Sequence, residues 1–402
     1  MAYLGFDDTD SRRGLCTTWL ATEFLREFRD WDLIGYPRLV RLNPNVPWKT
    51  RGNGALCLRL GRGRGTPRVV GAIGGEDVLA YPRGVDAPVD DALEARVRRV
   101  MERGSDLADP TTHPGYALLD RRPGPALYWR AVRTIVTVDD ALDAANGCGR
   151  VRGYKDGRGR IGAVAALSWR PRDRTYEVLA YRERSRWGTP RDVDASSVVE
   201  MDRRFRTTFN NWDPENRHVV IAPSSPCPVL CGIRGDAPDD LPRALAAVRT
   251  EPVDRWLLFE TNQGTDDHLV RTNGRVLQPR TSVSIDGVVA APPRVLAGGH
   301  VVFPVRRPRG DLADCTVYEP AKQLRRVARA LRPGDRVRVC GAVRDIPRTV
   351  NVEKLAVRSL APGTRRLAVG WYEPPPSARR HLARPLARSG PRTAAPGRAG
   401  AS

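Results

Sequence analysis

Three carboxylates lie within four residues near the start of the chain. Asp7, Asp8 and Asp10 closely follow the apolar run Y-L-G-F. Carboxylates this close together repel one another unless a cation or several hydrogen-bond donors relieve the repulsion. Hard oxygen ligands suit Mg²⁺, which usually binds proteins together with phosphate groups. We therefore interpret this acidic turn as a candidate catalytic site that holds Mg²⁺ and a nucleotide. A solvated turn that caps a helix explains the same residues equally well.

A basic, glycine-rich loop follows between Arg41 and Gly54, with the sequence R-L-N-P-N-V-P-W-K-T-R-G-N-G. Its cations and backbone N–H groups can surround phosphate, although it does not match the P-loop pattern. A second loop, G-Y-K-D-G-R-G-R, alternates glycine and arginine, and a hairpin turn explains it as well. Carboxylates for a metal and cations for phosphates are complementary parts of a phosphoryl-transfer site. The candidate ATP- and phosphate-binding residues are Lys49, Thr50, Arg51, Gly52, Asn53, Lys155 and Arg158.

Two polar segments, T-F-N-N-W-D and T-N-Q-G-T-D-D, are candidates for contacts with RNA bases. Their amides can hydrogen-bond a base edge, and the first segment also carries aromatic rings on which a base can stack. Turns stabilised by Asn and Asp side chains are an equally good explanation of both segments. The candidate RNA-contacting residues are Asn210, Asn211, Asp213, Asn262 and Gln263.

Several secondary-structure elements must position these residues. The apolar run before the acidic turn predicts a buried strand, and apolar residues at helical spacing after it predict a helix capped by Thr17 or Thr18. The N-terminus of that helix would offer N–H groups to an anion. Asp90 is a candidate cap for a second helix. Further strands are expected at residues 39–42, 55–60, 131–138, 161–169 and 175–181, and further helices at residues 90–101, 196–204 and 241–248.

The composition favours a polyanionic partner. The chain has 402 residues and a formal net charge of +21. Coding bias explains most of the excess of arginine over lysine, but it does not explain the sign of the net charge. Seven cysteines without a C-x-x-C pair argue against a disulfide framework and favour a reducing compartment. No apolar run reaches the length of a membrane span, so we expect a cytoplasmic protein without a membrane partner.

The order of the expected elements predicts an α+β multidomain chain. Residues 1–130 are typical of an α/β unit, and residues 131–265 are typical of an α+β unit of ferredoxin-like type. Residues 266–362 predict an OB-fold β-barrel, which commonly binds nucleic acid. Residues 363–402 are rich in Pro, Ala and Arg and predict a disordered basic tail. The barrel strands are expected at 281–289, 300–305, 316–318, 336–342 and 349–357, with a helix at 322–331.

Further motifs are spread along the chain beyond the acidic turn and the basic loop. They are Y-K-D-G-R-G-R-I-G-A, W-G-T-P-R, E-M-D-R-R-F, T-F-N-N-W-D, I-A-P, P-V-L-C-G-I-R-G and T-N-Q-G-T-D-D-H-L. Taken together, these segments resemble the archaeal tRNA(Ile) 2-agmatinylcytidine synthetases, the TiaS family. The resemblance covers roughly the first nine-tenths of the chain, and its motifs are collectively specific.

The resemblance implies both a fold and a reaction. It implies a kinase-like domain that activates cytidine with ATP, packed against a ferredoxin-like domain and followed by the OB-fold. The implied enzyme is an ATP-dependent ligase acting on an isoleucine tRNA with the anticodon CAU. It would activate the wobble cytidine, and agmatine would then displace the phosphate, so that the tRNA decodes AUA. By the same resemblance, Thr17 or the adjacent Thr18 would be autophosphorylated, and Asp7, Asp8 and Asp10 would hold Mg²⁺ or polarise the reacting groups.

The chain departs from the resemblance at its C-terminus. The family usually ends in a zinc ribbon with paired cysteines, whereas this chain has no cysteine after Cys340. We therefore expect no structural zinc, because tetrahedral zinc needs four ligands, or three and a water. Two other functions are compatible with the sequence: a non-catalytic tRNA-binding protein with an OB-fold, and a different ATP-using RNA-modification enzyme. The acidic turn and the basic loop favour an enzyme, since RNA binding alone requires neither.

Overall fold

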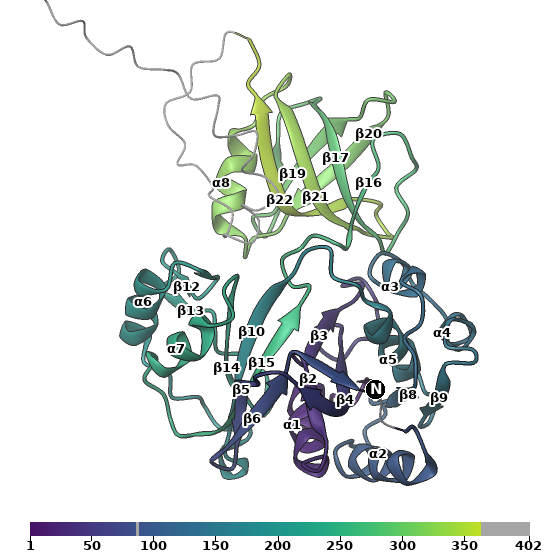
Figure 1. Cartoon of the computed structure of the whole chain (residues 1–402). Helices are drawn as coiled ribbons and strands as arrows, with labels where there is room; N and C mark the ends of the chain where they lie inside the picture. The colour runs from purple at the N-terminus through teal and green to yellow at the C-terminus, as the bar shows by residue number, and fades with distance from the viewer. Residues whose placement is uncertain (86–87, 363–402) are drawn as a thin grey trace, which may run out of the picture.

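The computed structural model describes residues 1–85 and 88–362, which form an α+β body and a separate β-barrel (Figure 1). The body is built around one 13-stranded sheet. Eleven strands follow one path: β11 (Thr208–Phe209), β14 (Val229–Gly235), β10 (Thr175–Arg182), β15 (Val253–Thr261), β5 (Arg68–Ile73), β6 (Glu76–Tyr81), β2 (Asp32–Ile34), β4 (Gly54–Arg64), β1 (Ala2–Asp7), β8 (Gly115–Leu119) and β9 (Gly149–Gly153). Two more attach beside it: β3 (Arg38–Arg41) on β15 and β4, and β7 (Arg83–Val85) on β4.

Helices and one small hairpin complete the body. The predicted helices at 90–101, 196–204 and 241–248 are confirmed with small shifts of their ends, and so are the strands at 39–42, 55–60 and 175–181. The helices are α1 (Thr17–Glu27), α2 (Asp91–Arg103), α3 (Ala126–Ala131), α4 (Val138–Ala144), α5 (Gly159–Ser168), α6 (Ala195–Arg204) and α7 (Asp240–Ala246), with a 3-10 turn at Arg184–Arg186. The hairpin consists of β12 (Trp212–Asp213) and β13 (His218–Val219).

Strand β1 lies inside the sheet and leads into the acidic turn, as the sequence predicts. Leu4 and Phe6 belong to the same hydrophobic cluster as the buried face of α1. Gly5 faces α5 instead, and a Cβ atom at this position would lie 2.2 Å from the carbonyl oxygen of Ala163. Glycine therefore lets α5 pack directly on the strand. The same alternation of side chains places Asp7 on the α5 side of the sheet.

Two strand predictions are wrong. Residues 131–138 form the end of α3, a connection and the start of α4, and residues 161–169 belong mainly to α5. The α5 sequence G-R-I-G-A-V-A-A-L-S is buried along most of its length. A short, continuously apolar run does not distinguish a buried strand from a buried helix by periodicity. Its alanines favour the helix.

The two cap predictions have different outcomes. Asp90 caps α2 as predicted, because its Oδ1 accepts a hydrogen bond of 2.8 Å from the backbone N–H of Leu93. The prediction that Thr17 or Thr18 caps α1 is wrong by one residue, since Cys16 stands at the N-cap and makes no side-chain bond there. The carboxylate of Asp10 accepts from the N–H of Thr17 at 2.6 Å instead, so the acidic turn itself supplies the cap.

The C-terminal unit is a barrel with the strand and helix order predicted for an OB-fold. Five strands close in the order β17, β21, β22, β20, β19 and back to β17. Hydrophobic side chains from all five strands and the helix α8 form its core. The elements are β17 (Ser282–Val289), β19 (Val301–Arg306), β20 (Leu312–Val317), α8 (Lys322–Ala330), β21 (Arg336–Val343) and β22 (Val350–Ser359), with β16 (Leu269–Arg271) and β18 (Arg294–Val295) added at the edges.

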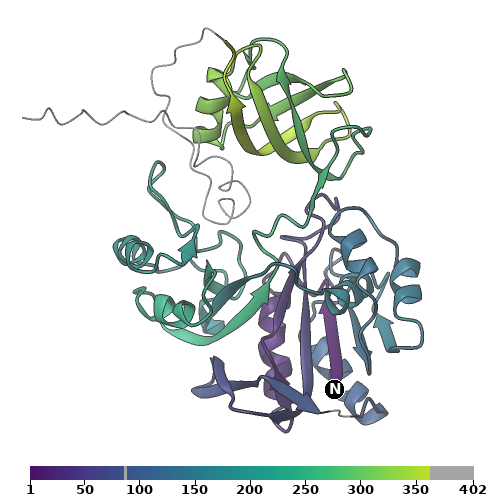
Figure 2. The same cartoon turned by 45° about the horizontal axis from the view of Figure 1, so that its top comes forward.

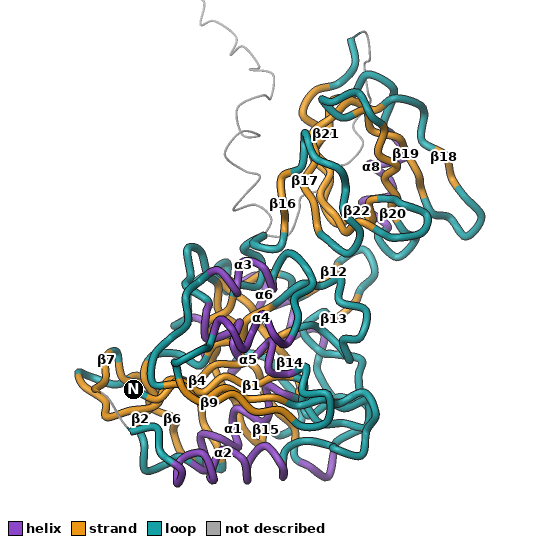
Figure 3. Tube along the Cα trace, turned by 90° about the vertical axis from the view of Figure 1, so that its right-hand side faces the viewer, coloured by secondary structure: helices purple, strands orange, loops and turns teal. Residues whose placement is uncertain are grey.

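The barrel lies beyond one end of the body (Figures 2 and 3). Its contacts with the body include the segment that follows β3. Asn43 donates to the carbonyl oxygen of Arg280 at 3.1 Å, and Asn45 donates to the hydroxyl of Ser282 at 3.0 Å. Within the described residues, no helix has the length and apolarity needed to cross a membrane. The domain boundary expected at residue 130 stays a prediction, and the tail at residues 363–402 lies outside the described residues.

Candidate active site

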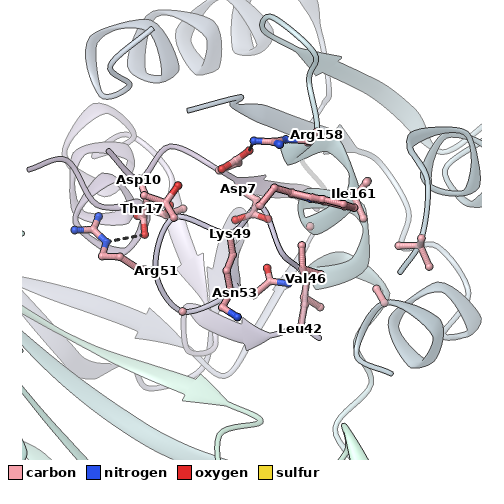
Figure 4. A pocket seen from close by; sticks show the side chains of 18 of the residues that line it. Asp7, Asp10, Thr17, Leu42, Val46, Lys49, Arg51, Asn53, Arg158 and Ile161 are labelled. Carbon is pink, nitrogen blue, oxygen red and sulfur yellow. Dashed lines mark hydrogen bonds and ion pairs between the residues drawn. The ribbon is translucent and has the colours of Figure 1, made fainter. Parts of the chain in front are cut away.

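A pocket opens where β1 ends, between the acidic turn, the basic loop and the start of α5 (Figure 4). Segments that are far apart in the sequence meet there, because β1 and β4 are paired in the sheet and α5 packs on both strands. The predicted site residues that line it are Asp7, Asp8, Asp10, Thr17, Lys49, Thr50, Arg51, Gly52, Asn53 and Arg158. Leu42, Val46, Trp48, Gly54, Ala131, Thr134, Ile135, Val136, Ile161 and Gly162 complete the lining.

Asp7 forms no ion pair among the described residues, and Asp8 pairs only with Arg158. Burial raises the pKa of Asp7 well above its usual value, and the neighbouring carboxylates raise it further. Burial also raises the pKa of Asp8 to about 6, although Arg158 lies 3.6 Å away and opposes the shift. Asp8 adopts a positive φ of 57°, a strained conformation for a residue with a side chain. Such strain and such pKa shifts are typical of functional sites.

The carboxylate of Asp10 is held by hydrogen bonds from other protein groups to a greater extent than those of Asp7 and Asp8. Its carboxylate accepts from the hydroxyl of Thr17 at 2.9 Å and from Arg51 at 3.1 Å, in addition to the helix cap (Figure 4). Among the described residues, no three Asp, Glu, His or Cys side chains are grouped so that they could hold a metal ion. The expected three-carboxylate Mg²⁺ site is therefore not assembled, because Asp10 is directed at Arg51 and Thr17.

Asp7 and Asp8 by themselves still fit the chemistry of Mg²⁺. This ion often binds one or two carboxylates and takes its remaining ligands from phosphates and water. The two buried carboxylates repel each other, and a divalent cation would relieve that repulsion. The donor set thus suits a metal that enters together with a nucleotide.

The basic side of the pocket contains donors without partners. The hydroxyl of Thr50 and the Nε of Arg158 are both buried and have no hydrogen-bond acceptor among the described residues. An unsatisfied buried polar group costs about 1–3 kcal/mol. Lys49 donates only to the carbonyl oxygen of Pro44, at the exposed edge of the loop. These groups are available to the oxygens of a phosphate.

Helix α5 begins at the pocket, and sequence reasoning missed this element. Its first N–H groups are already bonded to loop carbonyls, for example Gly159 N–H to His113 O at 3.0 Å. The helix can therefore stabilise an anion mainly through its dipole, because it has few free N–H donors at this end. Gly162 packs against the Asp7 carboxylate, and a Cβ atom there would lie 1.9 Å from Oδ2. The glycine spacing in G-R-G-R-I-G is the signal in the sequence that indicates such a close approach.

Comparison with known proteins identifies the family. Two family models match the chain, the TiaS TCKD domain over residues 3–155 and the TiaS FLD domain over residues 157–268. A relative from Methanosarcina mazei, the isoleucine-tRNA 2-agmatinylcytidine synthetase TiaS, is 37% identical, and the match covers 96% of this chain and 97% of the relative. The chain belongs to the TiaS family. A relative of the same name from Methanocaldococcus jannaschii is 34% identical over 96% of this chain and 98% of its own length.

Solved TiaS structures have the same fold. The complex of TiaS with its isoleucine tRNA and ATP matches with a TM-score of 0.79 and 35% identity, covering 97% of this chain and 98% of that one. The complex with the same tRNA, AMPCPP and agmatine matches with a TM-score of 0.77 and 35% identity, covering 90% and 83%. The sequence-based recognition of the TiaS family and of an α+β multidomain fold with a barrel is confirmed.

The two threonines expected to be autophosphorylated in a TiaS enzyme lie in different places. Thr17 lines the pocket, is buried, and accepts a hydrogen bond of 3.0 Å from the hydroxyl of Thr9. Thr18 does not line the pocket, and its hydroxyl lies 3.1 Å from the Cys16 sulfur. The position favours Thr17, and its modification stays a prediction.

The remaining predicted residues lie outside the pocket lining, and their roles in a TiaS enzyme stay predictions. Lys155 donates to the carbonyl oxygen of Asp109 at 2.6 Å, which ties its loop to the one beside the acidic turn. The amides of Asn211 and Asn262 are used inside the protein: Asn211 donates to Asp202 and Thr208, and Asn262 bonds the backbone of Arg41. Asn210 lies in a bend with a φ of 61°, and Gln263 lies in a turn where its carbonyl oxygen accepts from Thr175. Asp213 ends β12 and accepts from the amide of Asn216.

Proposed function

We propose that this protein is an ATP-dependent ligase that attaches agmatine to the wobble cytidine of the isoleucine tRNA with the anticodon CAU, giving 2-agmatinylcytidine and AUA decoding. The relatives named for this activity match along nearly their full length, and solved TiaS complexes contain an isoleucine tRNA, ATP or AMPCPP, and agmatine. The observation that carries the proposal for this chain is the pocket itself. Two buried carboxylates with raised pKa values lie there, and only Asp8 has an ion-pair partner among the described residues. Beside them lie buried donors that have no acceptor in the described part of the chain.

The pocket has the parts that phosphoryl transfer needs. A carbonyl oxygen of cytosine is a poor leaving group, and phosphorylation converts it into a good one. Transfer of the phosphoryl group depends mainly on positioning and on charge stabilisation. We assign Lys49, Thr50, Arg51 and Arg158 to the phosphates of ATP. Mg²⁺, when bound at the acidic turn, would neutralise part of the phosphate charge.

We assign Asp7 and Asp8 to the metal and Asp10 to the positioning of its neighbours. Asp10 accepts from Arg51, which ties the basic loop to the acidic turn, and it fixes the start of α1. Because the Thr17 hydroxyl lines the pocket, we assign the autophosphorylated position to Thr17 rather than Thr18. The target cytidine must leave its base stack to reach these groups.

We assign the regions of the chain as follows. Residues 1–130 form a kinase-like domain, residues 131–265 form a ferredoxin-like domain that contributes to the active site, and residues 266–362 form an OB-fold that binds tRNA. The contribution of the second region is supported by α5, since Arg158 just before the helix and Ile161 and Gly162 within it line the pocket. Modification of tRNA takes place in the cytoplasm, and we place the protein there.

The two alternatives differ from this proposal in testable ways. A non-catalytic tRNA-binding protein gains nothing from two adjacent buried carboxylates, which repel each other and the phosphates of RNA. A different ATP-using RNA-modification enzyme would need the same pocket and would differ in the amine it transfers.

Mass spectrometry of modified tRNA decides among them. The CAU-anticodon isoleucine tRNA is incubated with the protein, ATP, Mg²⁺ and agmatine, and each component is omitted in turn. The expected result is a wobble nucleoside with the mass of 2-agmatinylcytidine in the complete mixture alone. An unmodified tRNA in the complete mixture contradicts the proposal, and modification with another amine but not agmatine supports the second alternative.

A further inference from the structure

Several arginines converge at the end of α5 that lies away from the pocket. The carbonyl oxygen of Trp169, just past the helix, accepts from Arg38 at 3.5 Å and from Arg170 at 3.5 Å. Arg122 donates to the same oxygen and also to the carbonyl oxygen of Leu167 at 3.1 Å. Arg170 also donates to Leu167 O at 3.0 Å and to Pro123 O at 2.9 Å. The three guanidinium groups thus donate to backbone carbonyl oxygens, which carry no net charge.

The negative charge near these arginines is too small to balance them. Glu260 pairs with Arg38 at 2.8 Å and with Arg174 at 2.9 Å. No other carboxylate among the described residues forms an ion pair with Arg38, and none forms one with Arg122 or Arg170. The partial negative charge at a helix C-terminus is about half an elementary charge. Arg122 and Arg170 both donate to the last carbonyl groups of α5, but the charge of one arginine already exceeds this partial charge, so the group keeps an excess of positive charge.

Arg59 adds another charge that no carboxylate of the described residues balances. Its Nη2 lies against Gly35, where a Cβ atom would approach to 1.9 Å, so glycine leaves room for the guanidinium. The Nε of Arg59 is buried and has no acceptor in the described part of the chain. Burial lowers the pKa of Arg59, and the neighbouring Arg38 lowers it further. Burial and then the surrounding arginines also lower the pKa of Arg122, to about 10.

We propose that this arginine cluster, formed by Arg38, Arg59, Arg122 and Arg170, is a second anion site that binds a phosphate group. Phosphate matches the planar fork of arginine and its several donors. Arg59, Arg122 and Arg170 are only half-buried, so an anion can reach them. Helix α5 has 10 residues, which separates the cluster from the active-site pocket by about 15 Å along the helix axis. The site does not depend on the proposed function of that pocket.

The first test measures phosphate binding to the full-length protein with its nucleotide pocket filled. Saturating AMPCPP and Mg²⁺ occupy the pocket, and radiolabelled inorganic phosphate is titrated by equilibrium dialysis, with chloride holding the ionic strength constant. We expect one phosphate per chain and an affinity at least tenfold weaker in Arg59→Gln and in Arg170→Gln. The control is Arg206→Gln, which removes an exposed arginine elsewhere on the body and leaves the affinity unchanged. Absence of saturable binding, or equal affinity in all four proteins, overturns the proposal.

A second measurement separates an anion site from a purely structural cluster. Like charges that are close together and desolvated destabilise the folded state. Removing one of them should therefore leave the melting temperature of the phosphate-free protein unchanged or raise it, and phosphate should stabilise the wild type more than Arg59→Gln. A structural role predicts the opposite, namely a lower melting temperature in Arg59→Gln and equal stabilisation by phosphate.

A third measurement identifies the source of the phosphate group. If the site holds a backbone phosphate of tRNA, added tRNA displaces the labelled phosphate, and the Arg59→Gln/Arg170→Gln variant binds tRNA more weakly than Arg206→Gln does. If the site holds a free anion, the label stays bound beside tRNA, and the two variants bind tRNA equally.

Discussion

Asp8 is the residue to which we assign the most direct part in the proposed chemistry of the pocket. It combines a positive φ, a pKa raised to about 6 by burial, and a loose contact of 3.6 Å with Arg158. Asp10 resembles it in the sequence but is held by Thr17 and Arg51. Two carboxylates of one acidic turn therefore have different surroundings, and the proposed function assigns Asp8 to the metal and Asp10 to the positioning of its neighbours.

Replacement of Asp8 by alanine should abolish ATP-dependent modification of tRNA and leave tRNA affinity nearly unchanged. A carboxylate repels the RNA backbone and does not contribute to binding it. Modification is measured by mass spectrometry and affinity by filter binding, with Asp77→Ala as the control at an exposed position. Full turnover in Asp8→Ala would show that the metal role assigned to this residue is wrong.

The raised pKa of Asp8 also predicts a dependence of stability on pH. A carboxyl group whose folded pKa exceeds its unfolded value binds more protons in the folded state, so its contribution to stability falls as pH rises toward about 6. Asp8→Asn removes this cost, and asparagine tolerates the positive φ. Without ATP and metal, Asp8→Asn should melt at a higher temperature than the wild type at pH 7.5.

At pH 4 the difference in melting temperature should largely disappear, because the wild-type carboxyl is then protonated in the folded protein. Thermal unfolding followed by circular dichroism at both pH values provides the comparison. An equal difference at pH 4 and pH 7.5 would mean that the charge of Asp8 is not its cause.

At the scale of elements, α5 connects the sheet, the pocket and the arginine cluster. It packs against β1 so closely that glycine is required at both Gly5 and Gly162. Its first turn contributes to the pocket lining, and its last turn is followed by the carbonyl group on which three arginines converge. A small displacement of this helix therefore affects the position of Asp7.

Gly162→Ala should reduce kcat/KM on the order of a hundredfold, since a displacement of about 1 Å at a reacting group can cost this much. The new Cβ atom would collide with the Asp7 carboxylate, which lies 1.9 Å from its position. The matched control is Gly274→Ala, where no atom lies within 4 Å of the added Cβ. If Gly162→Ala retains the activity of Gly274→Ala, the contact between Asp7 and α5 has no part in positioning the carboxylate.

At the scale of the whole molecule, the basic chain folds into two units, the body and the barrel. The net charge is +21, and the barrel is joined to the body through the segment after β3 that also carries the basic loop. Two acidic residues lie just before the barrel. Asp266 pairs with Lys354 of the barrel, and Asp267 accepts a hydrogen bond of 2.6 Å from Tyr128 of the body. The barrel and the basic loop are therefore mechanically connected.

Removal of the chain from residue 269 onward should weaken tRNA binding and reduce its dependence on salt, because each lost phosphate contact lowers the salt slope by about one unit. The cut keeps Asp267, whose bond to Tyr128 belongs to the body. ATP binding should survive, and it serves as the control for folding. An unchanged tRNA affinity and salt slope would exclude the barrel as an RNA-binding unit.

The sequence by itself determined the features that depend on nearby residues. The apolar run and the acidic turn predicted β1 and its end, Asp90 was predicted as a helix cap, and the alternating strands predicted the order of the barrel. These signals are local, since alternation, capping and turn formation involve residues within a few positions of one another.

Only the tertiary structure decided which groups face one another. The bond between Arg51 and Asp10 joins residues 41 positions apart, and the contact of Asp7 with Gly162 joins two separate elements. The helical state of α5 and the convergence of Arg38, Arg122 and Arg170 were equally invisible in the sequence. A short apolar run is compatible with helix or strand until packing selects one, and a surplus of charge at one place becomes apparent only when distant segments are brought together.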